Sequence, residues 1–442
     1  MNINDAVSFL SAEAKKCTTA FDVIAGHSKS EGVSVFQGKV QNTEISESVG
    51  IGVRVFNGEK PGYAYTEHLA EDSIRQTLKD ALSHTAFTKA IPIELPRPSE
   101  YRKLRMPYNE ELSKVTLAQM ADLSLEIEKK AFALSSKIEN IPYLGAGKEE
   151  SIVVFENSNG VHFENRRNGI SAGAGVLAVS GESKKLGAYD KSGLSFSLLS
   201  ADEIASKAVS RALELLSPSK IDSGKMPVVF SERVAGSLVA MYASSFYAEQ
   251  VQKGQSRLQG KLGAQIADKC FSLSSDPFRE DLPGVKTIDS EGVVAKQINL
   301  VQNGKLEDFL YNLETAQIDK RTSNGSAARS YSGKVGTSFS NLIVAPGSQK
   351  TEELLKLFPK CFFVVHLDGN SGCSAISGEM SIGAQGLYVE NGKIMHPVEG
   401  VTLSANFFDL LQSLVAVGNE YPDAYTSIQV PALAFPEIAL SN

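Results

Sequence analysis

Runs that alternate apolar and polar residues recur in three regions of the chain, each close to an Asn-Gly pair. Asn-Gly suits two-residue hairpin turns, because both central residues of such turns need a positive φ. The pairs lie at 57–58, 159–160, 168–169, 303–304, 324–325 and 391–392. Strand-like runs precede several of them, such as Val53–Phe56 before the first and Leu387–Glu390 before the last. The pattern therefore predicts three antiparallel meanders.

Helical periodicity separates these meanders. Residues 72–86, 116–134 and 201–216 place apolar side chains three and four positions apart, which favours helices with one buried face. Ser200 and Glu203 form a capping-box pattern at the start of the third helix. Residues 231–248 carry two apolar stripes with small residues between them, so we expect one helix that is buried over most of its circumference.

Two irregular stretches divide the chain. Residues 90–107 contain four prolines and mixed charge, so they cannot form one regular element. Residues 217–225 are short and rich in Ser, Pro and Lys. We expect an N-terminal α+β domain at 1–95, a Pro-rich linker at 96–109, a middle α+β domain at 110–217 and a larger β-rich C-terminal domain at 222–442. The expected fold class is α+β, with antiparallel meanders and packed helices in the N-terminal half and the buried helix in the C-terminal domain.

Composition is that of an ordinary soluble protein, since 42% of the residues are hydrophobic and 21% are charged. The 442 residues suffice to bury a sizeable core. A net charge of −7 argues against direct nucleic-acid binding through a basic field. No run approaches about 18 apolar residues, so we expect no membrane span. The N-terminus lacks the features of a signal peptide, which indicates a cytoplasmic protein.

No common catalytic motif occurs in the sequence. The chain has no dinucleotide fingerprint, no phosphate-binding loop and no nucleophile elbow. Its six histidines are far apart, and its four cysteines show no metal-ligand or disulfide spacing. Cys373 lies in a turn-rich stretch and, beside His366 or His396, could act as a nucleophile. The sequence shows neither a lowered pKa nor an oriented base, so we interpret Cys373 as a packing residue.

Two sets of charged residues allow a simple and a functional interpretation. Asp289 and Glu291 would point to one face of a strand, where paired carboxylates can do acid–base work or bind a cation. The simpler interpretation is a solvated strand end beside a turn. The basic pairs at 166–167 and 184–185 are most simply exposed loop charges.

Three stretches, in order, resemble the TldD/PmbA family, whose members were once called modulators of DNA gyrase. The first runs from Gly38 to Thr66 and includes Gly50-Ile51-Gly52-Val53-Arg54-Val55-Phe56-Asn57-Gly58. The second is Thr287-Ile288-Asp289-Ser290-Glu291-Gly292, followed by Asn324-Gly325 and by Ser338-Phe339-Ser340-Asn341. The third runs from Ser377 to Leu403. The resemblance covers nearly the whole chain.

The resemblance also implies where a metal site would be. In the TldD branch, a helix carries His-Glu-x-x-x-His and a cysteine near the C-terminus completes a zinc site, with the glutamate as general base. The matching positions here hold Ala240, Met241, Ser245 and, near the cysteine position, Val430. Residues 222–265 contain no histidine at all. The chain therefore resembles the other branch, PmbA or TldE, and we expect it to bind no cofactor itself.

That branch pairs with a TldD subunit, which holds the zinc, in a peptidase that trims peptide precursors and degrades small unfolded proteins. The resemblance implies a non-catalytic subunit that shapes a peptide channel, with Asp289, Glu291 and Asn341 as candidates for lining it. Two alternatives stay open. One is a stand-alone homodimeric binding or regulatory protein, to which the gyrase label belongs, and the other is a hydrolase based on Cys373.

Overall fold

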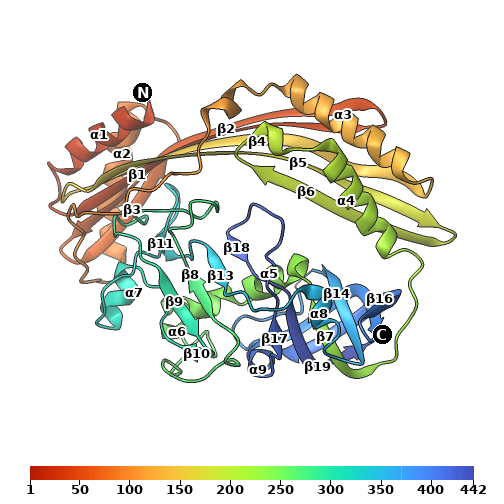
Figure 1. The fold of residues 1–442 in the computed structure, drawn as a ribbon. Coiled ribbons are helices and arrows are strands. Elements are labelled where there is room, and N and C mark those ends of the chain that lie inside the picture. The colour runs from red at the N-terminus through yellow and green to blue at the C-terminus, as the bar shows by residue number, and fades with distance from the viewer. Residues whose placement is uncertain (370) are drawn as a thin grey trace.

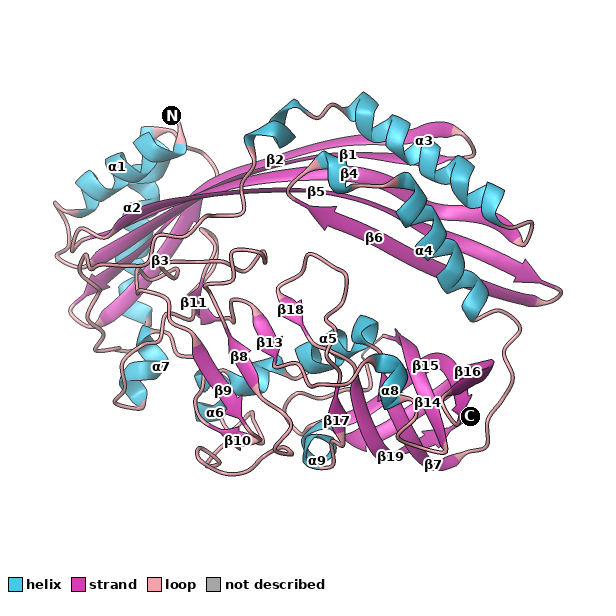
Figure 2. Ribbon diagram, viewed as in Figure 1, coloured by secondary structure: helices cyan, strands magenta, loops and turns pink. Residues whose placement is uncertain are grey.

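The protein is described by a computed structural model that covers residues 1–369 and 371–442. Figure 1 shows a long curved sheet, built by the N-terminal half, that arches over a C-terminal half of smaller sheets and short helices. Helices and largely antiparallel sheets are mixed throughout, so the α+β prediction is confirmed (Figure 2). Among the described residues, no helix is long and apolar enough to cross a membrane.

The arch is a six-stranded antiparallel sheet with the order β3-β2-β1-β4-β5-β6. Its strands are β1 (Phe21–Phe36), β2 (Lys39–Asn57), β3 (Lys60–Thr66), β4 (Ile138–Asn157), β5 (His162–Ser180) and β6 (Ser183–Gly193). Strand β1 pairs with β4, so the regions expected at 1–95 and 110–217 share one sheet. The domain boundaries themselves stay predictions.

All four long helices cover one face of the arch (Figure 2). They are α1 (Ile3–Ala14), α2 (Glu71–His84), α3 (Leu117–Leu134) and α4 (Ala201–Glu214). Alternation along the strands explains this, because Val53 and Val55 are buried against the helices while Arg54, between them, points to the opposite side. Ser200 caps α4 by accepting the N–H of Glu203 at 3.3 Å. The opposite face faces the C-terminal half, and among the described residues none of these four helices packs on it.

The proline-containing stretch forms no helix or strand between η1 (Thr85–Phe87) and η2 (Glu110–Lys114). The pair Asn168-Gly169 lies inside β5, so the turn expected there does not form. The buried side chain of Asn168 instead accepts the N–H of Asn109 and donates to its carbonyl, both at 2.8 Å. At Asn391, by contrast, a φ of 49° followed by 74° at Gly392 gives the expected hairpin turn.

The C-terminal half contains a closed barrel of five strands, because β16 pairs with both β15 and β19. The strands are β7 (Gly224–Phe230), β14 (Lys360–Asp368), β15 (Glu379–Glu390), β16 (Lys393–Asn406) and β19 (Leu433–Ser441), with β17 (Ala416–Val417) beside β19. A second sheet contains β8 (Leu273–Ser275), β9 (Ile298–Gln302), β10 (Lys305–Leu306), β13 (Leu342–Val344) and β18 (Ile428–Gln429). Strands β11 (Ala327–Ala328) and β12 (Gly336–Thr337) form a ribbon. Short helices of this half include α7 (Leu313–Ile318), α8 (Thr351–Leu354) and α9 (Phe407–Gln412), whereas η3 (Phe196–Leu198) lies between β6 and α4 in the N-terminal half.

The single helix expected at 231–248 is broken. Helix α5 spans Glu232–Met241, and η4 (Ala243–Phe246) and α6 (Ala248–Gln252) follow it. Buried Tyr242 marks the break, since its ring stacks on Phe407 at 4.2 Å and its hydroxyl donates to the Glu379 carbonyl at 2.9 Å. These contacts fix the side chain and override the helical pattern. Nor is α5 buried all round, because Ser237 is exposed.

Candidate functional site

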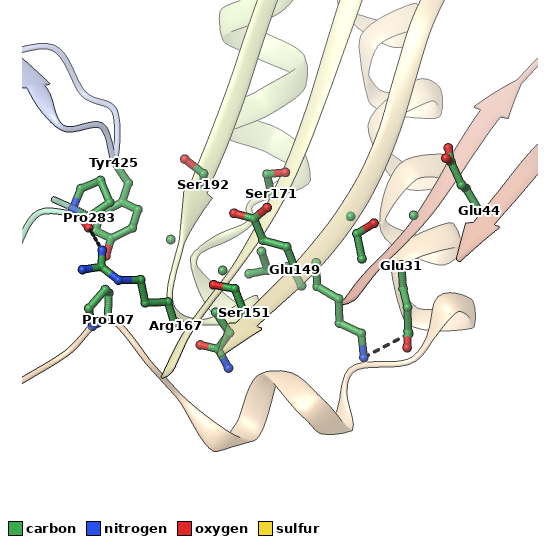
Figure 3. Close-up of a pocket in the computed structure, with 18 residues that line it drawn as sticks. Glu31, Glu44, Pro107, Glu149, Ser151, Arg167, Ser171, Ser192, Pro283 and Tyr425 are labelled. Atoms are coloured by element: carbon green, nitrogen blue, oxygen red, sulfur yellow. Dashed lines mark hydrogen bonds and ion pairs between the residues drawn. The ribbon is translucent and has the colours of Figure 1, made fainter. Parts of the chain in front are cut away.

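A cleft of about 570 Å³ lies between the helix-free face of the arch and the C-terminal half (Figure 3). Strands β1, β2, β4, β5 and β6 form its floor, and Pro283 and Tyr425 border it from the C-terminal half. A second hollow of about 530 Å³ continues along the same face and shares Gly32, Glu44, Gly147 and Ser171 with the first. We call the two hollows together the open groove.

The groove is open because its floor consists of small residues. One row crosses five strands: Glu44 of β2 lies opposite Gly32, Gly32 opposite Gly147, Gly147 opposite Ser171, and Ser171 opposite Ser192. After the glutamate, every member of that row is Gly or Ser, so little side-chain volume fills the space above the strands. Ser151, Ser171 and Ser192 add hydroxyl groups, which can both donate and accept hydrogen bonds (Figure 3).

Arg167 closes the groove at the end nearest the C-terminal half. Its Nη1 donates to the Pro283 carbonyl at 2.7 Å, and its Nη2 donates to the Val285 carbonyl. Burial lowers the pKa of this guanidinium. The interpretation of residues 166–167 as exposed loop charges is therefore wrong for Arg167, which lies in β5 and joins the two halves. The Tyr425 hydroxyl is buried beside it and has no hydrogen-bond partner among the described residues (Figure 3).

A buried charge network joins the two halves at the opposite end of the arch. Arg54 of β2 donates to Asp22 of β1 through Nε at 2.8 Å and to Glu291 of the C-terminal half at 2.6 Å. Arg329, also from the C-terminal half, donates to Asp22 at 2.5 Å. Burial opposes the charge of Arg54, but the charges of Asp22 and Glu291 outweigh it, so the pKa of Arg54 is raised. Because this contact depends on residues far apart in sequence, spacing alone could not predict it.

Asp289 and Glu291 are buried, at 2% and 1% exposed, so the interpretation as a solvated strand end is wrong. Asp289 accepts the N–H groups of Glu291, Val293 and Ala327, each at 2.9 Å. Burial, followed by the charge of Glu291, raises the pKa of Asp289 to about 6. Asp289 thus binds backbone N–H groups, whereas Glu291 binds Arg54 and also accepts the N–H of Leu313 at 2.8 Å.

Asn341 is fully buried, and its side chain forms hydrogen bonds with backbone groups. Its Oδ1 accepts the Gly284 N–H and its Nδ2 donates to the Asp276 carbonyl, both at 2.8 Å. Pro283, which borders the cleft, is the neighbour of Gly284. Asn341 therefore holds the segment that forms one side of the cleft. Direct lining of a peptide channel by Asp289, Glu291 and Asn341 stays a prediction.

Three family models match the chain in order. The PmbA/TldA metallopeptidase domain 1 matches residues 21–84, the central domain matches 110–216 and the C-terminal domain matches 223–442. This chain belongs to the PmbA/TldD family. The resemblance found in the sequence is thereby confirmed.

Individual members of the PmbA/TldD family agree with this assignment. Metalloprotease PmbA of Escherichia coli O157:H7 is 25% identical over 421 residues, which are 94% of this chain and 91% of that protein. A crystal structure from Thermotoga maritima, named for modulation of a DNA gyrase, is 26% identical with a TM-score of 0.90 and full coverage of both chains. TldE from Thermococcus kodakarensis is 18% identical with a TM-score of 0.87, over 99% of this chain and 100% of that one, and shows the shared fold alone.

The name metalloprotease implies a metal, but the residues at the expected positions do not fit one. Ala240 and Val430 offer no donor atom, and Met241 offers only a thioether. Ser245 is buried, and its hydroxyl donates to the Ala375 carbonyl at 2.7 Å. Within residues 1–369 and 371–442, no group of three or more His, Cys, Asp or Glu side chains is placed to hold a metal ion. No step of chemistry is therefore assigned to a metal on this chain.

Cys373, the candidate nucleophile of the sequence, is held in packing contacts. Cys373 is partly buried against the main C-terminal core and forms an isolated bridge with Met380. His366 lies 3.3 Å from Asp368, and the ring of His396 stacks on Tyr388 at 5.2 Å. In the described part of the chain, no hydrogen bond joins Cys373 to either histidine. Neither histidine is therefore placed to act as a base for this thiol.

Sequence reasoning missed further residues that join the halves of this PmbA/TldD family member. Lys185 is 8% exposed and forms an ion pair with Glu399 of the barrel, so it is not an exposed loop charge. Asp423 precedes β18 and pairs with Lys191 at 2.8 Å and with Lys207 at 2.6 Å. Hydrogen bonds from these two lysines lower the pKa of Asp423. The small residues of the groove floor left a detectable signal in the sequence, because Gly or Ser occupies alternate positions 145, 147 and 151, with Glu149 between them, and 169, 171 and 173.

Proposed function

We propose that this chain is the non-catalytic subunit of a TldD/TldE-type zinc metallopeptidase complex, and that the open groove holds part of the peptide substrate. The observation that carries the proposal is the residue content of the metal positions, since Ala240, Met241, Ser245 and Val430 supply neither ligands nor a general base. The relatives are named metalloproteases, so the zinc and the base belong to a TldD-type partner.

The groove supports the peptide part of the proposal. Its floor is small and polar where the row of Gly and Ser residues crosses β1, β4, β5 and β6. An extended peptide can lie close to such a surface, and the hydroxyl groups can bond to its main chain without selecting its sequence. Proteolysis of unfolded peptides or maturation of peptide precursors needs a site that binds mainly through the peptide main chain, and these hydroxyl groups offer such bonds.

A free strand edge supports association with a second subunit. Strand β3 pairs only with residues 51–57 of β2, so residues 39–50 keep an outer edge with no partner strand among the described residues. Ile45 on this segment is 63% exposed and Val40 is 45% exposed. Natural proteins normally shield long edges of this kind, and an unshielded edge suits pairing with another chain.

Reconstitution with a TldD-type subunit tests the proposed function. We expect the purified chain to hold no stoichiometric zinc and to cleave no peptide, and the mixture to cleave an unfolded peptide in a chelator-sensitive manner. The control is a partner whose motif glutamate is changed to glutamine, which should assemble but not cleave. Native mass spectrometry separates the heterodimer from a homodimer of this chain. Chelator-sensitive cleavage by this chain alone would overturn the proposal.

The Cys373 alternative is tested in the same assay. Cys373→Ser preserves the size of the side chain, so the reconstituted activity should stay within about threefold of the parent. A hundredfold loss in a folded variant would instead support a cysteine hydrolase.

A further inference from the structure

We propose that the open groove selects extended peptides that carry lysine or arginine side chains. This inference rests on the proposed function, in which the groove holds peptide, and it names the chemical class that the groove prefers. Three carboxylates of the groove produce this preference, because the cations beside them are bound to other partners.

The three carboxylates come from different strands of the helix-free face. Glu44 of β2 begins the row of small residues, Glu149 of β4 stands beside that row, and Asp190 of β6 lies at its far end. Figure 3 shows Glu44 and Glu149 on the same side of the sheet. In the described part of the chain, none of the three forms an ion pair or a side-chain hydrogen bond. They therefore leave an uncompensated negative charge on an otherwise neutral floor.

The cations that line the groove are already committed. Arg167 donates to the Pro283 and Val285 carbonyls. Lys148 points to the helix side, where its ammonium donates to the Val115 carbonyl at 2.6 Å and lies 3.3 Å from Glu31. Neither can reach the three carboxylates without giving up these bonds. The field of these three carboxylates attracts a cationic ligand into the groove and repels an anionic one, whereas a neutral ligand gains nothing from it.

The spacing of the charges fits an extended peptide. Glu44 and Ser192 lie at the two ends of the row, four strand spacings apart. At about 4.8 Å per spacing the row is about 19 Å long, which an extended chain covers with about six residues. A peptide that crosses the strands can therefore place basic side chains near Glu44, Glu149 and Asp190 in turn. The glycines and serines between them leave room for its backbone.

Charge-matched peptides test the inference on the full-length chain. We would measure fluorescence anisotropy with labelled unstructured peptides of about ten residues, built on Gly and Ser and carrying Lys, Gln or Glu at the same positions. The Lys peptide should bind at least tenfold tighter than the Glu peptide at about 50 mM salt, and this ratio should shrink at about 300 mM salt because the exposed charges are screened.

Variants then assign the preference to the groove. The triple variant Glu44→Gln, Glu149→Gln, Asp190→Asn should lose at least tenfold in affinity for the Lys peptide and change little for the Gln peptide. The control triple variant Glu110→Gln, Asp122→Asn, Glu182→Gln removes the same charge from exposed positions outside the groove lining, so it should keep the preference.

The outcomes separate this inference from the proposed function. Equal affinity for the three peptides, or an equal loss in both triple variants, overturns the charge preference and leaves the subunit role untouched. No binding of any peptide overturns the groove as a site on this chain, whereas the subunit role is decided by the reconstitution. If the reconstituted complex cleaves no peptide although this chain binds the Lys peptide, that result would count against the proposed function alone.

Discussion

At the scale of single residues, buried charges carry the contacts that hold the arch onto the C-terminal half. The side chain of Arg54 is 3% exposed, and its partners Asp22 and Glu291 are 0% and 1% exposed. A buried ion pair adds little to stability when complete, because desolvation offsets the attraction between the charges. Breaking one is different, because it leaves a buried charge without its partner. The network is therefore a polar contact between the halves that is costly to break.

Arg54→Met should lower the free energy of unfolding by about 3–5 kcal/mol, because Glu291 and Asp22 lose the cation between them. The measurement is the urea midpoint followed by circular dichroism. Arg75→Met is the matched control, since Arg75 is 41% exposed and pairs with Glu71 on the surface of α2. Its effect should stay below about 1 kcal/mol. Equal midpoints for the two variants would show that the network is dispensable.

Asp289 makes stability depend on pH in a defined direction. Burial and the charge of Glu291 raise the pKa of Asp289 to about 6 in the folded protein, whereas an unfolded aspartate has a pKa of about 3.9. Between these values the folded state binds more protons, so the contribution of Asp289 to stability is full below about pH 4 and is lost as pH rises through 6. At pH values well above this folded-state pKa, Asp289 no longer makes this contribution to stability.

Asp289→Asn removes this titration. The urea midpoint of the parent should therefore fall relative to that of the variant between about pH 4 and pH 6.5, and the difference should be constant above pH 7. Asp281→Asn is the control of opposite sign, because the hydrogen bond from Arg279 lowers the pKa of Asp281. The urea midpoint of the parent should therefore fall relative to that of Asp281→Asn as pH falls below about 4. A parent-minus-Asp289→Asn difference that does not change across pH 4 to 6.5 would refute the assigned pKa.

At the scale of elements, the sequence pattern predicted those helices and loops whose formation depends on residues close together in the chain. Helical periodicity located α2, α3 and α4 to within a few residues, and the prolines located the irregular stretch before η2. The break at Tyr242 escaped prediction because the ring of Phe407 that stacks on it lies far away in sequence. The groove could not be predicted for the same reason, since its row of small residues exists only when β2, β1, β4, β5 and β6 pair in register.

The segment around α5 also determines what restoring the metal ligands would do. We expect the variant Ala240→His, Met241→Glu, Ser245→His, Val430→Cys to gain no peptidase activity. Ser245 and Val430 are 1% and 0% exposed, so a histidine at 245 overpacks the core by about 1–3 kcal/mol and displaces the bond to Ala375. The new imidazoles would also lack the neighbours that orient metal ligands.

The readouts are zinc content after dialysis and cleavage of an unfolded peptide. The double variant Ala240→His, Met241→Glu is the matched control, because both positions are partly exposed and should accept the changes with the fold intact. Chelator-sensitive cleavage by the four-fold variant alone would show that the surrounding space is open and that ligands are all this chain lacks.

At the scale of the whole molecule, the groove exists only while the two halves stay docked. Arg167, Lys185 and Asp423 hold the β5–β6 side of the arch to the C-terminal half. At the other side, Tyr331 packs against glycines of β1 and β2, and its hydroxyl donates to Glu67 at 3.0 Å. The halves therefore meet at both sides and leave the groove between them.

Gly52→Ala should separate the halves at the Tyr331 contact. A Cβ at Gly52 would lie 1.9 Å from the Tyr331 carbonyl oxygen, which is backbone and cannot turn aside, so the arch must move away. We expect faster proteolysis in residues 88–109 and 217–225 and a larger radius of gyration in X-ray scattering, with the helix content unchanged. Gly32→Ala is the matched control, because it lies on the same face of the sheet and its Cβ would meet nothing closer than the Ala146 oxygen at 3.8 Å. Unchanged proteolysis and scattering in Gly52→Ala would mean that the Tyr331 contact does not hold the arch. A loss of helix content in that variant would mean that the N-terminal half cannot fold without it.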